Sequence, residues 1–306
     1  MSPAAAVEPA VQRWAAVSVV AASVVWGVYW IPQRELAALG LGGGWATVMQ
    51  FACGLAFLLP VALWRTARGL PTGAGRATHG LLLGGGFVLY ANSLFLTNVV
   101  HALLLFYIVP LWGAVLEILV MRRRVRLARW GTIALGLAGV WVIMAGDGVI
   151  PWPRNLGDWM ALASGVITAV GILRYRLRPP AGLFDAVFPF TLYGTVATVL
   201  CVTLLAGHIA AAPVAPDWAA LVPVVLLVGV VYMLVANAGI LWGASRLEPS
   251  RFGVLMMADV AVGVATAAVL AGEPFGWREA LGSALILGAA ALEAAGVGAS
   301  PEPRIG

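Results

Sequence analysis

The sequence predicts an all-α, polytopic membrane protein with ten transmembrane helices in two inverted repeats of five. Composition, the number of apolar stretches and the distribution of arginine support this prediction. Of the 306 residues, 62% are hydrophobic and 10% are charged, and the mean hydropathy is +0.97. Soluble domains contain about 45–50% apolar and about 25% charged residues. The composition therefore excludes a soluble enzyme, a disordered chain and a secreted disulfide scaffold.

Ten apolar stretches are long enough to cross a bilayer, for which a helix needs about 20 residues. The segments between them are short, so the chain has no room for a separate domain outside the membrane. The predicted spans are residues 13–31, 45–64, 79–97, 100–121, 130–147, 157–174, 184–205, 219–243, 251–271 and 277–297.

Arginine supplies all 18 basic residues, and its distribution is strongly asymmetric. The ten predicted spans place 15 of the arginines on the side of the two termini, and only Arg34, Arg154 and Arg278 on the other side. Cytoplasmic loops of membrane proteins carry the excess of positive charge. We therefore expect a multi-pass protein of the cell inner membrane with both termini in the cytoplasm.

Internal similarity indicates a repeat. Residues 89–96 read LYANSLFL and residues 234–241 read LVANAGIL, and a glycine-rich stretch from Gly131 resembles another from Gly282. Since each half then has five spans, an odd number, the second half must be inserted upside down, as in many secondary transporters. The predicted organisation is a cytoplasmic tail (1–12), a first repeat (13–147), a linker (148–156), a second repeat (157–297) and a second cytoplasmic tail (298–306).

Several short motifs accompany these spans. They are Trp26-Gly27, Tyr107 with Pro110, Gly157-Asp158, Leu247-Glu248-Pro249 and Gly272-Glu273-Pro274. Through these motifs, which are spread along the whole chain, the protein resembles the ten-helix EamA-type branch of the drug/metabolite transporter superfamily. Stretches 107–112 and 232–241 are most similar to the aromatic-amino-acid exporters of that branch. The resemblance implies ten helices around a central cavity and export of small metabolites.

Asp259 is the leading candidate for a functional charge. It lies about nine residues into a predicted span, roughly 13 Å deep at 1.5 Å per residue, where the resemblance implies a proline. A carboxylate at this depth is costly and usually faces a cavity or a partner. Asp259 could couple transport to a proton or bind a substrate ammonium group. The alternative is a hydrogen bond that only holds helices together.

Other candidates for the substrate pathway are polar or aromatic side chains inside predicted spans. Amides can bind charged substrate groups, and buried tyrosine and tryptophan need polar partners, although all of these side chains could also serve packing alone. The candidates are Trp26, Tyr29, Tyr90, Asn92, Tyr107, Trp112 and Asn237. Glu117 is seven residues before Arg124, and we interpret the two as an ion pair near the membrane surface.

The predicted function is secondary active or facilitative transport by alternating access. No arginine lies in the middle third of a span, which disfavours phosphorylated substrates. The favoured substrate is a small neutral or zwitterionic metabolite, above all an amino acid, and the resemblance favours export. The expected partners are this substrate and the lipid bilayer, with a proton as candidate coupling ion, and no nucleic acid, cofactor or metal is expected. A channel and a lipid-modifying enzyme are the alternatives, but no nucleophile, acid and base cluster in the sequence, so an enzyme is disfavoured.

Overall fold

The computed structural model describes residues 8–97, 99–144, 152–209, 217–272 and 275–296, and all regular structure within them is helical. Residues 1–7 of the first predicted tail, the whole second tail (298–306), residues 148–151 of the predicted linker and Glu273-Pro274 lie outside these residues. The helices are α1 (Pro9–Gly27), α2 (Trp30–Ala38), α3 (Gly44–Ala67), α4 (Ala77–Ser93), α5 (Val99–Phe106), α6 (Val109–Leu119), α7 (Leu127–Met144), α8 (Leu156–Leu177), α9 (Leu183–Leu204), α10 (Ala206–Ile209), α11 (Trp218–Leu227), the π-helical segment η2 (Val228–Ala236), α12 (Asn237–Ala244), α13 (Pro249–Met256), α14 (Ala258–Ala271) and α15 (Trp277–Ala294).

Seven helical segments among the described residues are long and apolar enough to cross a membrane. α7 contributes a shorter apolar helix, and α4 and α15 do not belong to this set. The multi-pass character is therefore clear from length and composition, whereas the count of ten spans stays a prediction. The seven segments are Pro9–Ala38, Gly44–Ala67, Ala102–Leu119, Leu156–Leu177, Leu183–Leu204, Trp218–Ala244 and Pro249–Leu270.

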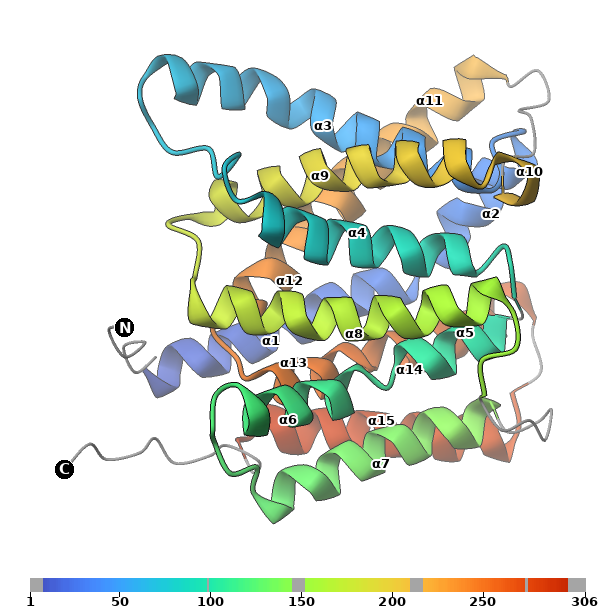
Figure 1. Ribbon diagram of the computed structural model, residues 1–306. Helices are drawn as coiled ribbons and strands as arrows, with labels where there is room; N and C mark the ends of the chain where they lie inside the picture. The colour runs from blue at the N-terminus through green and yellow to red at the C-terminus, as the bar shows by residue number, and fades with distance from the viewer. Residues whose placement is uncertain (1–7, 98, 145–151, 210–216, 273–274, 297–306) are drawn as a thin grey trace.

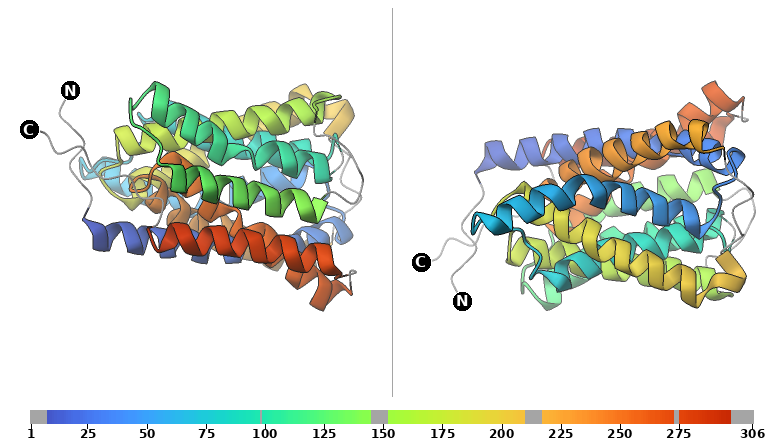
Figure 2. Two further views of the ribbon diagram at one scale, coloured as in Figure 1. Left: turned by 90° about the horizontal axis from the view of Figure 1, so that it is seen from below. Right: turned by 90° about the horizontal axis from the view of Figure 1, so that it is seen from above.

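The long helices run side by side in one bundle (Figures 1 and 2). α3 and α9 lie at one edge, and α7 and α15 lie at the opposite edge (Figure 1). α1 begins and α15 ends at the same end of the bundle (Figures 1 and 2). This arrangement agrees with two termini on one side of the membrane.

Many helix pairs join the two predicted repeats, and among them are α3 with α9, α6 with α13, and α7 with α15. In each of these three pairs the two helices come from spans that an inverted repeat would make equivalent. The last pair approaches very closely, because a Cβ atom added to Gly139 would lie 2.6 Å from the carbonyl oxygen of Gly282. Close helix approach of this kind depends on small residues. α4 also packs closely against α8 and α9, which are not its equivalents in the predicted repeat, so the inverted repeat remains a prediction.

Two of the predicted spans are built from two helices each. Predicted span 100–121 contains α5 and α6, and Pro110, which has no N–H to donate, lies in the first turn of α6. Predicted span 251–271 contains α13 and α14, which are joined at Met257 by hydrogen bonds of the tighter three-residue kind. Broken helices at membrane depth are tolerated where protein surrounds them or where they line a cavity.

Candidate substrate site

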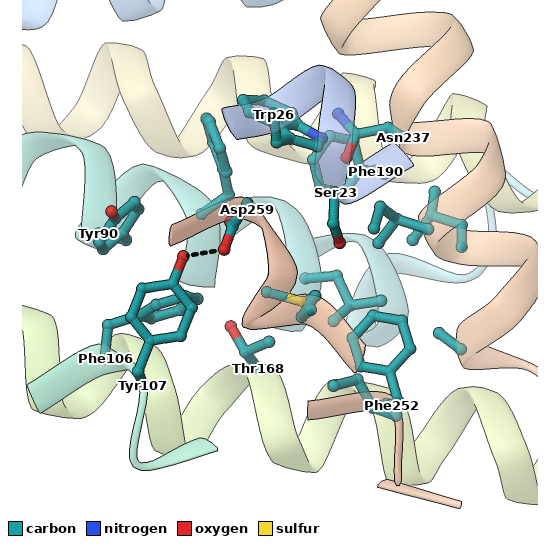
Figure 3. A pocket seen from close by; sticks show the side chains of 17 residues that line it. Ser23, Trp26, Tyr90, Phe106, Tyr107, Thr168, Phe190, Asn237, Phe252 and Asp259 are labelled. Carbon is teal, nitrogen blue, oxygen red and sulfur yellow. Dashed lines mark hydrogen bonds between the residues drawn. The ribbon is translucent and has the colours of Figure 1, made fainter. Parts of the chain in front are cut away.

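A cavity lies at the two helix breaks, between helices of both predicted repeats (Figure 3). Its empty space is about 740 Å³ when its open side is included. The lining residues are Ser23 and Trp26 from α1; Leu83, Phe87 and Tyr90 from α4; Phe106 from α5; Tyr107 from the break before α6; Thr168 and Ile172 from α8; Phe190 from α9; Asn237, Ile240, Leu241 and Ala244 from α12; Phe252 and Met256 from α13; and Asp259 from α14.

One hydrogen bond joins the two breaks across the cavity. The Tyr107 hydroxyl donates to Asp259 Oδ1 at 2.6 Å (Figure 3). Tyr107 lies between α5 and α6, and Asp259 is the second residue of α14, where the unpaired N–H groups of a helix favour negative charge. Asp259 remains half-buried, so its carboxylate is accessible from the cavity. Both broken helices therefore contribute to one polar contact at the centre of the site.

Seven of the 17 lining residues are aromatic, and several of them hold each other in place. The ring of Trp26 lies 4.8 Å from that of Tyr29 and 5.2 Å from that of Phe87, measured between centroids. The rings of Tyr90 and Phe106 lie 4.4 Å apart. Inclined aromatic pairs at such distances are mutually stabilising. The cavity wall is therefore formed by aromatic rings that pack against one another.

The remaining polar groups in the lining are uncharged. Asn237 donates from its side-chain amide to the Met233 carbonyl oxygen, one helical turn before it, at 3.5 Å. The Ser23 hydroxyl is buried and has no hydrogen-bond partner among the described residues. Thr168 adds a second hydroxyl to the lining. A bound molecule would thus meet one carboxylate, one amide and several hydroxyl groups.

Of the eight residues predicted for the substrate pathway, the structure brings five together around this cavity. They are Trp26, Tyr90, Tyr107, Asn237 and Asp259. Their role in transport remains a prediction, but their proximity could not be read from their spacing.

The other three predicted residues lie outside the lining. Tyr29 packs behind Trp26 and donates a hydrogen bond to Gln50. Asn92 is fully buried and donates to the carbonyl oxygen of Val88 in its own helix at 2.9 Å. Trp112 packs against the hydrophobic core, and its indole N–H has no hydrogen-bond partner among the described residues. The structure therefore places none of these three side chains in the lining of the cavity.

Sequence reasoning missed several lining residues. Phe87, Phe106, Phe190 and Phe252 carry no polar atom, so nothing in an apolar span distinguishes them from side chains that face lipid. Ser23 gave no signal, because a serine is common in apolar helices.

A second buried polar group of side chains lies where α6 ends and where α7 and α13 begin. We call Glu117, Arg129, Glu248, Arg251 and Glu293 the arginine cluster. Arg129 is fully buried, and its guanidinium lies 3.5 Å from Glu117, 3.6 Å from Glu248 and 3.6 Å from Glu293. Arg251 lies 3.9 Å from Glu293. The cluster therefore joins helices from both predicted repeats.

Neutral side chains donate further hydrogen bonds to the cluster, although Arg129 Nε and Nη2 and Glu293 Oε2 have no hydrogen-bond partner among the described residues. Ser250 donates to Glu117 from its backbone N–H at 2.8 Å and from its hydroxyl at 2.7 Å. Thr132 donates to Glu293 at 2.5 Å. Buried ion pairs require such additional partners to offset their loss of hydration.

The structure corrects the predicted pair of Glu117 and Arg124. α6 ends at Leu119 and the chain turns at Arg122, whose φ is +53°. A spacing of seven residues therefore no longer places both side chains on one helix face. Arg124 is exposed, and Arg129 of the next helix pairs with Glu117 instead.

Comparison with known proteins supports the first half of the chain most directly. Residues 13–145 match the EamA-like transporter family. The matching family consists of membrane transporters of small molecules, and the match agrees with the apolar helices of a multi-pass membrane protein.

The solved structures support the fold of the whole chain. A crystal structure with 23% sequence identity superposes with a TM-score of 0.73, over 93% of this chain and 97% of its own. At this identity the likeness establishes the fold alone. Twenty-five solved chains match in total, whereas no curated protein matches the sequence.

Proposed function

We propose that the chain is a secondary transporter that exports a small metabolite with an amino group, an amino acid first, across the cell inner membrane. The observation that carries the proposal is the contact of Tyr107 with Asp259 where two broken helices meet in an aromatic cavity. In transporters built from inverted repeats, substrates bind at broken helices near the middle of the membrane.

Alternating access is the proposed mechanism, because residues from both predicted repeats line the cavity. Rocking of one repeat against the other would open the cavity to each side in turn. Asp259 would take part in one of two ways. It would bind the substrate ammonium group, or it would load and release a proton.

The decisive experiment reconstitutes the purified protein into liposomes loaded with a mixture of amino acids and measures efflux and counterflow. A carrier gives saturable flux that unlabelled substrate on the other side accelerates. A channel gives flux without this acceleration, and turnover of added phospholipid would point to the enzyme. Absence of any protein-dependent flux would overturn the proposal.

Asp259→Asn separates the two roles of the carboxylate, since the amide keeps the shape of the side chain. If Asp259 only couples transport to protons, accumulation driven by a pH gradient is lost and exchange continues. If it binds the substrate, exchange and driven transport weaken together. If neither changes, Asp259 has no part in transport.

The proposed orientation places both termini in the cytoplasm. It rests on the 15 arginines that the predicted spans place on one side. A reporter fused after Gly306 should therefore be active in the cytoplasm, and one inserted within residues 208–217 should be active outside. Activity of both in the same compartment would show that the number of spans is wrong.

A further inference from the structure

We propose that the cavity selects a net-cationic organic amine, that is, a molecule with an ammonium group, an aromatic or apolar body and no carboxylate. This inference rests on the proposed function, because it assumes that the substrate occupies this cavity. It keeps the transport mechanism of the proposed function and replaces the amino acid favoured by the sequence with an amine that has no carboxylate.

The first argument is the charge of the lining. Among the 17 described residues that line the cavity, Asp259 is the only acid, and none is arginine or histidine. The chain contains no lysine at any position. Asp259 has one side-chain hydrogen-bond partner among the described residues, the Tyr107 hydroxyl, and no cationic side chain lies beside it in the lining. A cationic ligand would supply the missing charge.

The second argument is the engagement of the buried arginines elsewhere. Arg129 contacts three glutamates within 3.6 Å, and Arg251 contacts Glu293 and donates to its backbone oxygen at 3.1 Å. Neither side chain lines the cavity. A substrate carboxylate would therefore enter without a fixed cation to receive it.

The third argument compares the two charged ends of an amino acid in this lining. An ammonium group would be attracted to the Asp259 carboxylate and to the faces of the surrounding rings, since cations are attracted to aromatic faces. A carboxylate gains only neutral donors such as Ser23 and Asn237, which replace hydration without neutralising the charge. Removing the carboxylate from the ligand should therefore strengthen binding.

The test uses four ligands that share a phenyl ring and differ in charge. They are 2-phenylethylamine (cation), phenylalanine (zwitterion), 2-phenylethanol (neutral) and 3-phenylpropionate (anion). Isothermal titration of the purified protein should show that 2-phenylethylamine binds at least about tenfold tighter than phenylalanine, and that 3-phenylpropionate binds weakest. Equal or tighter binding of phenylalanine or 3-phenylpropionate would overturn the inference.

Asp259→Asn identifies the residue that makes the selection. In this variant the amine and the alcohol should bind within about threefold of each other, whereas Asp259→Glu should keep the preference for the amine. An unchanged preference in Asp259→Asn would overturn the assignment to this carboxylate. If Asp259→Asn does not fold, the ranking with the unaltered protein and with Asp259→Glu still decides.

A second measurement separates this inference from the proposed function. Liposomes are loaded with amino acids together with phenyltrimethylammonium, whose permanent charge prevents passive leakage. Release of the quaternary amine supports the inference. Release of amino acids alone overturns the inference and leaves the transporter proposal intact. If neither compound is released, the transporter proposal is overturned, and the titration alone then tests whether the cavity selects amines.

Discussion

The substrate cavity and the arginine cluster differ in how their charged side chains are paired. In the cavity, Asp259 is half-buried and has a single side-chain partner, Tyr107. In the cluster, the guanidinium of Arg129 lies within 3.6 Å of three carboxylates, and the cluster is supported by additional hydroxyl donors. With Arg123, which lies 3.9 Å from Glu248, the three glutamates of the cluster meet three arginines, whereas Asp259 has no cation among the described lining residues.

α13 connects the two regions directly. Its first turn supplies Ser250 and Arg251 to the cluster, and its later residues Phe252 and Met256 line the cavity just before Asp259. Motion of this short helix would therefore affect both regions. We therefore expect the paired charges of the cluster to serve stability, while the unpaired carboxylate of Asp259 is the basis of the proposed ligand site.

The largest expected effect follows from breaking the balanced region. Arg129→Met would leave Glu117, Glu248 and Glu293 without their shared cation. Removing one partner of a buried ion pair costs about 3–5 kcal/mol, so we expect strong loss of folded protein after detergent extraction and a lower melting temperature.

Arg124→Met is the matched control, because this arginine is exposed and lies five residues from Arg129. Its melting temperature should stay close to that of the unaltered protein. Equal destabilisation by both substitutions would show that the cluster is no special source of stability.

A smaller effect should come from the aromatic wall of the cavity. Trp26→Ala removes a lining ring that packs on Phe87, and loss of such a contact costs about 1–3 kcal/mol, or roughly 5- to 150-fold in apparent substrate affinity. The sequence also predicted Trp112 for the pathway, but the structure places it outside the lining. Trp112→Ala should therefore reduce transport only in proportion to protein abundance. A raised apparent substrate constant in Trp112→Ala alone would reverse this assignment.

Much of the fold was predictable because apolar length dictates it. The predicted spans 157–174 and 184–205 agree closely with α8 and α9. The break after Phe106 has a visible cause in Pro110, whereas the break at Met257 has neither proline nor glycine at the joint. That break depends on packing between helices, which no local pattern reveals.

The site was predictable only where a side chain conflicted with its surroundings. Asp259 and Tyr107 stood out as polar groups in apolar spans, and both line the cavity. Phe252 did not stand out, because it resembles any apolar helix residue. The pairing of Glu117 with Arg129 was unpredictable for another reason, since it depends on how the chain turns between α6 and α7.

The smallest effect should come from loss of the hydrogen bond between the Tyr107 hydroxyl and the Asp259 carboxylate. Tyr107→Phe keeps the ring in the cavity and removes the hydroxyl that donates to Asp259 Oδ1. A hydrogen bond to a charged group contributes about 1.5–3 kcal/mol, but solvent in the cavity can replace part of it. We therefore expect the apparent substrate affinity to fall by about 3- to 10-fold, measured by counterflow in liposomes.

Tyr90→Phe is the matched control, because the Tyr90 ring also lines the cavity and its hydroxyl has no hydrogen bond among the described residues. If Tyr90→Phe lowers the affinity as much as Tyr107→Phe does, the hydroxyl groups act on the substrate directly and Tyr107 does not position Asp259. If only Tyr107→Phe has an effect, and Asp259→Asn removes any further effect of Tyr107→Phe, the tyrosine acts through the carboxylate.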